Sequence, residues 1–219
     1  MLEVRHLNAS YGQAQVLFDV SLSVPLGSMV LIQGLNGAGK STLLKSIMGL
    51  MNNVTGNVNW QGRALENLPP YARSQMGLGY VPEDRRLFAA LTVRQNLEIA
   101  MPLSNQAPSK ALTTRLQLQD VLALFPTLGG MLDRPASQMS GGEQQMLALG
   151  RTLMTQANLL LLDEPCEGIA PVLVQSIAKA LEKLKSQGFT LLIAEQNQIL
   201  SAMADQVLHM ASGHLSETK

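Results

Sequence analysis

The stretch GLNGAGKS at residues 34–41 decides the fold. An apolar run at residues 28–33, typical of a short buried strand, precedes it, and a helical pattern over residues 40–50 follows it. The stretch fits the spacing G-x-x-x-x-G-K-[ST], in which glycines let backbone N–H groups curl around a phosphate. The N-terminus of the following helix adds partial positive charge. A strand, this loop and a helix in that order predict a phosphate-binding loop rather than a glycine-rich turn without a ligand.

Two side chains of this loop carry its chemistry. Lys40 brings a positive charge to the β- and γ-phosphates, and Ser41 offers a hydroxyl to Mg²⁺, a hard ion that prefers oxygen ligands. The residues of this segment expected to bind nucleotide are Gly34, Asn36, Gly37, Ala38, Gly39, Lys40, Ser41 and Thr42.

An acidic pair follows the strongest apolar run of the chain. Residues 159–162 are four leucines, and Asp163 and Glu164 come directly after them. If this strand lies beside the phosphate strand, Asp163 reaches the Mg²⁺ and Glu164 lies near the γ-phosphate, where it can take a proton from the attacking water or orient it. Solvated acids at a strand end are the alternative, which the phosphate loop disfavours.

The composition excludes two classes of protein. Hydrophobic residues make up 46% of the 219 residues, which excludes intrinsic disorder. The 16 Lys and Arg balance the 16 Asp and Glu, so no basic field indicates nucleic acid. Charged residues make up only 15%, against roughly 25% for an average domain. Either partner chains cover part of the surface, or the domain is simply apolar.

The cysteine count and the hydropathy bear on the compartment. Cys166 is the single cysteine, so no disulfide framework forms within the chain and a reducing compartment is expected. The N-terminus lacks the pattern of a signal peptide, and no apolar run approaches the roughly 20 residues of a membrane span. The chain is therefore expected not to cross a membrane.

An α/β pattern surrounds a helical insertion. Residues 2–7 and 15–24 alternate like strands of an antiparallel layer, and further strands are expected at 56–60, 78–82, 159–162, 189–194 and 206–210. Helices are expected from about residue 69 and over 172–187. Residues 91–154 have helical spacing, broken by Pro102, Pro108, Pro126 and Pro135. We expect an α/β fold with a mixed-sheet core at 1–84 and 152–219, and a helical subdomain at 85–151.

One further segment points to a family. The stretch QMSGGEQQ at residues 138–145 resembles the L-S-G-G-Q signature of ATP-binding cassette (ABC) proteins, with Met139 in place of Leu. Tyr11 matches the aromatic residue that stacks on adenine in that family. Glu83, in YVPE at residues 80–83, lies at the position of the glutamine loop, and Gln196 at that of the switch histidine. The similarity covers nearly the whole chain.

Longer segments resemble one subfamily, the ATPase subunits of branched-chain amino acid importers, to which urea importer subunits are closely related. These segments are VPEDRRLFAALTVRQNL, MSGGEQQMLALGRTLM, DEPCEGIAPVLVQSI and AEQN. Glu83 for Gln, Gln196 for His and Ala170 for Asp follow that subfamily. Leu35 departs from it, because the subfamily often has a polar or basic residue there.

The resemblance implies an Mg²⁺-dependent ATPase with a P-loop NTPase fold of the ABC type. Its ATP lies between the phosphate loop of one subunit and the signature of another. The catalytic residues implied are Lys40, Glu83, Glu164 and Gln196, and the metal ligands are Ser41, Glu83 and Asp163. Tyr11, Ser140, Gly141 and Gly142 complete the nucleotide contacts.

The resemblance also implies partners and a location. The partners are membrane-spanning permease subunits, a second cassette that is a sister chain or a copy of this one, and indirectly an external solute-binding protein. No nucleic acid is expected, and the location is peripheral, on the cytoplasmic face of the inner membrane. A urea or amide importer is the alternative. A non-transport cassette acting on ribosomes or DNA is disfavoured because the chain has one cassette and zero net charge. A small-molecule kinase would have a phosphate loop but no reason to carry the signature at Ser140, Gly141 and Gly142, so this class is also disfavoured.

Overall fold

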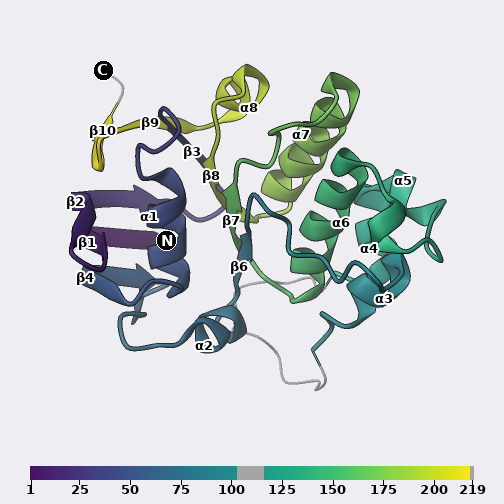
Figure 1. The fold of residues 1–219 in the computed structure, drawn as a ribbon, viewed down its shortest axis with the longest axis horizontal. Helices are drawn as coiled ribbons and strands as arrows, with labels where there is room; N and C mark the ends of the chain where they lie inside the picture. Colours follow the sequence, from purple (N-terminus) through teal and green to yellow (C-terminus); the bar gives the residue numbers. More distant parts are fainter. Residues whose placement is uncertain (103–115, 218–219) are drawn as a thin grey trace.

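Two β-sheets and the helices between and around them form the molecule (Figure 1). The computed structural model describes residues 1–102 and 116–217. The larger sheet has the order β10-β9-β3-β8-β7-β6. Its strands are β3 (Met29–Gln33), β6 (Leu78–Val81), β7 (Leu159–Asp163), β8 (Thr190–Ala194), β9 (Gln206–Ala211) and β10 (His214–Glu217). All neighbours are parallel except β9 and β10, which makes the sheet mixed, as predicted.

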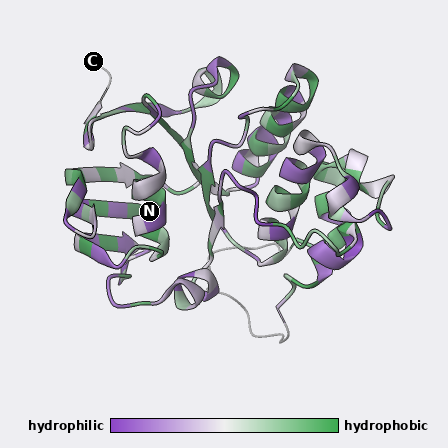
Figure 2. Cartoon of the chain, viewed as in Figure 1, coloured by the Kyte–Doolittle hydropathy of each residue, from purple (hydrophilic) through white to green (hydrophobic). Residues whose placement is uncertain are grey.

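The smaller sheet is antiparallel, with the order β2-β1-β4-β5. Its strands are β1 (Leu2–Tyr11), β2 (Ala14–Val24), β4 (Asn53–Trp60) and β5 (Arg63–Ala64). Figure 2 shows hydrophobic and hydrophilic residues alternating along β1, β2 and β4, because one face of this sheet is buried. The predicted antiparallel layer is therefore confirmed.

Helix α1 (Lys40–Met48) lies between the two sheets (Figure 1), whereas α6 (Gly141–Met154) and α7 (Pro171–Ser186) lie on the far side of the larger sheet. Strand β7 is buried on both faces of the larger sheet. Leu159 and Leu161 pack in the cluster that includes α1 and the antiparallel sheet, and Leu160 and Leu162 pack in the cluster with α6 and α7. A central parallel strand is apolar on both faces for this reason.

Short helices lie in the described parts of the segment between β6 and α6. They are α3 (Val93–Glu98), α4 (Leu118–Leu124), α5 (Pro126–Gly129) and the 3₁₀ helix η1 (Ala136–Gln138). Pro126 is the first residue of α5, and Pro135 directly precedes η1, so both prolines mark boundaries as expected. Pro108 lies outside the described residues.

Several elements differ from the sequence predictions. Helix α8 (Gln198–Met203) and the strands β5 and β10 were not predicted, and β1 continues to Tyr11.

The helix expected from about residue 69 is present as α2 (Pro70–Gln75), which begins with Pro70 at a position that tolerates proline. Over residues 1–102 and 116–217, no helix has the length and apolar character that crossing a membrane requires.

Candidate functional site

The phosphate loop connects the end of β3 to the start of α1. Gly37 and Gly39 have φ values of 81° and 111°, a region that glycine adopts without the steric cost of a Cβ atom. Gly34 is required for another reason, since a Cβ atom there would lie 2.2 Å from the carbonyl oxygen of Met210 on β9. The sequence GLNGAGKS therefore folds as the loop that its spacing predicts.

A cleft of about 220 Å³ opens over this loop. Across the cleft from the loop lie acidic residues of two other segments, the one after β6 and the one after β7. Its lining residues are Val16, Asn36, Gly37, Gly39, Lys40, Ser41, Thr42, Glu83, Glu164 and Glu167. Six predicted nucleotide-binding residues of the loop and two predicted catalytic acids thus share one cavity.

Lys40 is the buried cation of the cleft, with 3% of its surface exposed. Its Nζ donates to the carbonyl oxygen of Gly34 at 2.7 Å and to that of Leu35 at 3.3 Å. It also lies 3.0 Å from Oε1 of Glu164. The ammonium group is thus held over the loop by oxygen partners of the kind that phosphate oxygens can replace.

Asp163 at the end of β7 is held by two hydroxyl groups. Ser41 Oγ donates to its Oδ1 at 2.8 Å, and Tyr80 Oη donates to its Oδ2 at 2.9 Å. Burial raises the pKa of Asp163, and the hydrogen bonds from Ser41 and Tyr80 oppose that shift. The pair Ser41 and Asp163 fits Mg²⁺, because both offer oxygen to a hard cation and a divalent charge offsets the buried carboxylate.

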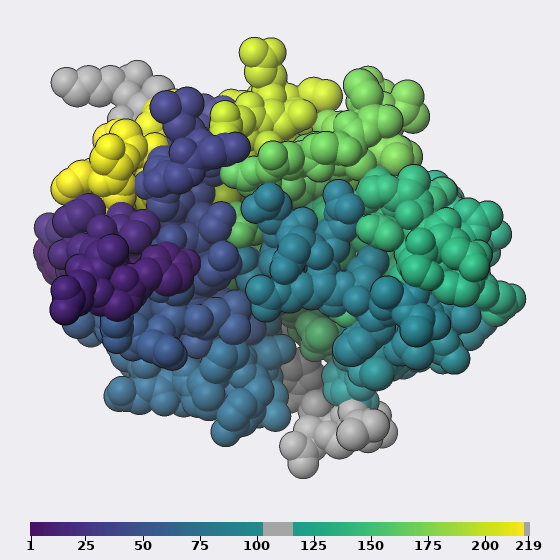
Figure 3. Space-filling model, viewed as in Figure 1, coloured from purple at the N-terminus to yellow at the C-terminus, as the bar shows by residue number. Residues whose placement is uncertain are grey.

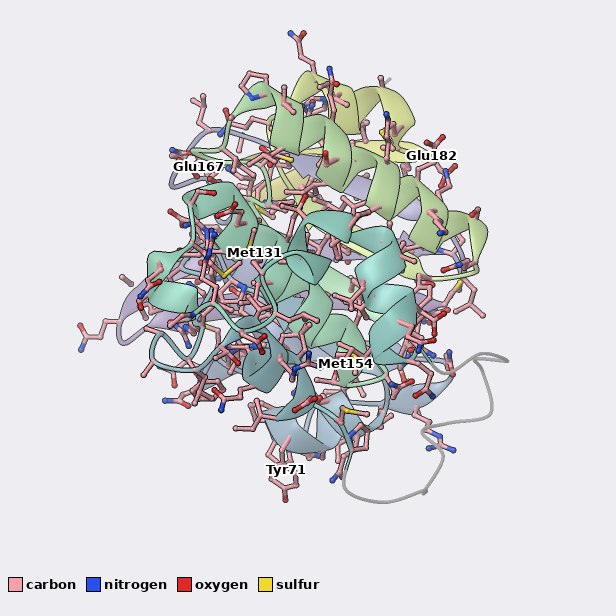
Figure 4. The ribbon with its side chains drawn as sticks, turned by 90° about the vertical axis from the view of Figure 1, so that its right-hand side faces the viewer. Tyr71, Met131, Met154, Glu167 and Glu182 are labelled. Atoms are coloured by element: carbon pink, nitrogen blue, oxygen red, sulfur yellow. The ribbon has the colours of Figure 1, made fainter. Side chains whose placement is uncertain are left out.

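Glu164 and Glu167 form a hydrogen-bonded pair of carboxyl groups beside Lys40. Burial alone would raise the pKa of Glu164, but hydrogen bonds from Glu167 and Lys40 outweigh burial and lower it. The hydrogen bond to Glu164 raises the pKa of Glu167 to about 7. Glu164 is therefore the ionised member of the pair. Figure 4 shows Glu167 and Glu182 toward opposite ends of α7.

Gln196 and Glu195 follow β8 at the same edge of the sheet. Gln196 Nε2 donates to Asn36 Oδ1 at 2.9 Å, which joins the predicted switch position to the phosphate loop. Glu195 is buried, and its carboxylate accepts the backbone N–H groups of Gln196, Asn197 and Cys166. Burial and Glu195 raise the pKa of Cys166 to about 12, in agreement with a small structural thiol.

Tyr11 and the signature lie apart from this cleft. Tyr11 ends β1 and is 50% exposed, and it does not belong to the cleft lining. Ser140 caps α6, since its Oγ accepts the N–H of Glu143 and its own N–H donates to Glu143 Oε2 at 2.7 Å. A Cβ atom on Gly142 would lie 2.3 Å from Leu173 Cδ1, so this glycine allows α6 to pack closely against α7.

Sequence reasoning missed Tyr80 and Glu195 as parts of the site. Tyr80 lies in β6 beside Leu161 of β7, and Glu195 follows β8 by one residue. A polar residue at the carboxyl end of a buried parallel strand is the signal that was available for both. Trp60 is 1% exposed and its Nε1 donates to the carbonyl of Met76, so it is a core residue and offers no face to a base.

Comparisons with known proteins identify the family of the chain. The family model described as ABC transporter matches residues 17–167, more than half of the chain. The high-affinity branched-chain amino acid transport ATP-binding protein BraG of Pseudomonas aeruginosa is 40% identical over 211 residues, covering 96% of this chain and 86% of BraG. The probable branched-chain amino acid transport ATP-binding protein LivF of Archaeoglobus fulgidus is 37% identical over 218 residues, covering 99% of this chain and 90% of that protein.

A solved structure extends the agreement to the fold. The ADP conformation of MJ1267, an ATP-binding cassette of an ABC transporter, aligns with a TM-score of 0.82 at 28% identity, over 99% of this chain and 89% of that chain. The chain belongs to the ABC transporter family and is one of its ATPase subunits.

Proposed function

We propose that the chain is the Mg²⁺-dependent ATPase subunit of an importer for branched-chain or related amino acids. The observation that carries the proposal is the cleft in which Lys40, Ser41 and Glu164 converge beside Asp163. The amino acid class rests on the names of the relatives BraG and LivF.

Each side chain of the cleft has a distinct task in hydrolysis. Lys40 binds the β- and γ-phosphates of ATP, the substrate, and Ser41 and Asp163 hold the Mg²⁺, which neutralises phosphate charge when bound. Glu164 accepts the proton of the attacking water, for which its lowered pKa keeps it ionised. Gln196 orients that water or the γ-phosphate by hydrogen bonding, and Glu83, which lines the cleft, would contact the metal when it is bound and the γ-phosphate.

A complete site requires a second chain. Ser140 and Gly141 begin the 14-residue helix α6, and none of the signature residues lines the phosphate cleft of their own chain. We place Ser140, Gly141 and Gly142 against the γ-phosphate of ATP that is bound by a second cassette, where the helix N-terminus favours the anion. Tyr11 stacks on the adenine. Two such sites form in a head-to-tail pair with a sister ATPase or a second copy.

The membrane-spanning subunit docks in a second cavity. A groove of about 440 Å³ lies between the α1–β6 region and the segment of short helices. Exposed Phe88 and Ile99 give it apolar walls, and Arg151 adds positive charge, as does Arg86, which is paired with Asp84. A short permease segment with apolar side chains and an acidic residue fits this lining. The subunit then lies peripherally on the cytoplasmic face of the inner membrane, and an external binding protein delivers the solute to the permease.

Uptake by the reconstituted transporter tests the proposal. The chain is purified with its membrane-spanning subunits, identified by mass spectrometry, and placed in proteoliposomes with the binding protein. We expect ATP-dependent accumulation of labelled leucine, isoleucine or valine, and none with the Lys40→Ala chain. Accumulation of urea without any amino acid would contradict the amino acid class, and association with ribosomes or DNA in place of a permease would contradict import.

A further inference from the structure

Tyr80 touches both the groove and the predicted metal site. Tyr80 lines the groove together with Met48, Phe88 and Ile99, while its hydroxyl donates to Asp163 Oδ2 at 2.9 Å. Tyr80 thus links these two features directly. We propose that Tyr80 is a positioning residue that orients Asp163 for Mg²⁺ and carries the occupancy of the groove to the metal site. This inference rests on the proposed function, in which Asp163 is a metal ligand and the groove receives the permease.

The fold explains why Tyr80 lies at this junction. Among the described residues, strand β6 is the edge strand of the larger sheet and pairs only with β7, where Tyr80 lies beside Leu161. Side chains alternate along a strand, so Leu78 and Tyr80 point to the face that α1 covers, which is also the face from which Ser41 reaches Asp163. The open edge of β6 leaves the ring of Tyr80 at the groove.

The backbone of β6 packs closely against its neighbours. A Cβ atom on Gly79 would lie 2.5 Å from Thr152 Cγ2 of α6 and 2.7 Å from the Cβ of Ala157, which lies between α6 and β7. The loop after β6 covers the junction between the N-terminal part and the helical segment on the face in Figure 3. Because β6 is closely packed at Gly79 and Tyr80 lines the groove, we expect a segment bound in the groove to displace the Tyr80 side chain rather than the strand.

The hydroxyl groups of Ser41 and Tyr80, which both donate to Asp163, have different roles. Ser41 is itself a predicted metal ligand, so its hydroxyl serves the ion as well as the carboxylate. The Tyr80 hydroxyl belongs to no predicted ligand set, and within residues 1–102 and 116–217 its hydrogen bond goes to Asp163. Groups that hydrogen-bond to a metal ligand fix its orientation, and their loss typically lowers metal affinity by about 10–100-fold.

The substitution Tyr80→Phe removes one oxygen atom and keeps the ring in the groove. We measure binding of Mg²⁺ to the ATP complex of the full chain by calorimetry, in the Glu164→Gln background so that ATP is not consumed. We expect the Mg²⁺ concentration for half-saturation to rise at least about tenfold, while the affinity for ATP without metal stays unchanged. The lost hydrogen bond to Asp163 should lower the unfolding midpoint, but the unfolding curve should show that the variant is folded at the temperature of the calorimetry.

The matched control is Tyr71→Phe, because Tyr71 on α2 is 69% exposed and points away from the molecule (Figure 4). It should leave Mg²⁺ binding unchanged. An unaltered Mg²⁺ requirement in Tyr80→Phe overturns the orienting role. Loss of ATP binding in Tyr80→Phe also overturns it, because Tyr80 would then serve the nucleotide or the fold. If the parent chain binds no ATP, the proposed function fails first.

A second substitution tests the connection to the groove. Ile99 lines the groove and is well exposed, so Ile99→Trp adds bulk there without touching the cleft. We expect Ile99→Trp to change Mg²⁺ affinity at least about twofold when Tyr80 is present and to have no effect in Tyr80→Phe. An equal change in both backgrounds, or no change in either, overturns transmission through Tyr80.

Discussion

At the residue scale, the contacts of Lys40 and Glu164 define the chemistry of the cleft. Lys40 is buried and needs an anionic partner, and Glu164 provides it at 3.0 Å. The neighbouring Glu167 donates a hydrogen bond to Glu164 in place of a second negative charge, in keeping with its raised pKa. Glu164 is thus the member of the pair that loses its proton first, and an ionised carboxylate is what a general base requires.

Replacing Glu164 with glutamine tests this role. Glu164→Gln keeps the shape and an oxygen for Lys40 but removes the base, so we expect ATP binding to persist and turnover to fall by roughly 10²–10⁴-fold. An ATP-bound dimer should accumulate in gel filtration. Glu167→Gln is the matched control, because its amide still donates to Glu164 and most of the turnover should remain. Near-normal turnover in Glu164→Gln would refute the assignment.

Tyr11 supports a separate prediction about adenine. Stacking of an aromatic ring on a base is worth about 1–3 kcal/mol, and Tyr11 is exposed at the end of β1. Tyr11→Ala should weaken ATP binding by about tenfold or more, whereas Tyr11→Phe should bind ATP nearly as well as the parent chain. Fluorescence titration with an ATP analogue provides the measurement. If Tyr11→Ala and Tyr11→Phe bind ATP with equal affinity, Tyr11 does not stack on adenine and serves only the turn after β1.

At the element scale, the apolar strands and the phosphate loop were predictable from sequence, and the peripheral elements were not. Runs such as residues 159–162 are buried on both faces, so their pattern reports their position directly. Strand β10 and helix α8 have only four and six residues, too few for a period to show. For Glu195 and Tyr80, the sequence shows a polar residue near the end of a buried strand but not its partner, because Cys166 and Asp163 lie far away along the chain.

Asp205 shows how such a contact joins elements. Its Oδ2 accepts the backbone N–H of Met29 on β3 at 2.8 Å, and Lys185 of α7 donates to its Oδ1. Burial alone would raise the pKa of Asp205, but the hydrogen bonds from Lys185 and Met29 lower it. A lowered folded-state pKa stabilises the fold above the unfolded pKa of about 3.9, and that stabilisation is lost as pH falls through the folded pKa.

Denaturation at two pH values tests this contribution. Asp205→Asn should lower the free energy of unfolding at pH 7 by about 1 kcal/mol, a modest value because the pair is partly exposed. The difference between the parent chain and Asp205→Asn should shrink once Asp205 is protonated, well below pH 4. Asp133→Asn, at a side chain that is almost fully exposed, is the control and should change stability little at either pH. A difference that is independent of pH would assign the effect to packing.

At the scale of the whole molecule, functional surfaces lie on different parts of one chain. The phosphate cleft opens beside β3 and β7, the signature begins α6, and the groove lies between α1, β6 and the short helices. The signature residues do not line the phosphate cleft of their own chain, and Gly142 packs α6 closely against Leu173 of α7. Pairing of two chains is the simpler way to complete the site.

A mixing experiment tests that pairing. Ser140→Arg places bulk and charge where we expect the partner's γ-phosphate, and it leaves the phosphate loop of its own chain intact. ATP binding to the single chain should therefore persist, while dimer closure and hydrolysis fail. In a homodimer, mixing Ser140→Arg with Lys40→Ala chains creates one site from two unaltered halves, so part of the activity should return. Recovery only after adding a sister ATPase would indicate a heterodimer. Normal hydrolysis by Ser140→Arg within the assembled transporter would show that the signature does not complete the site.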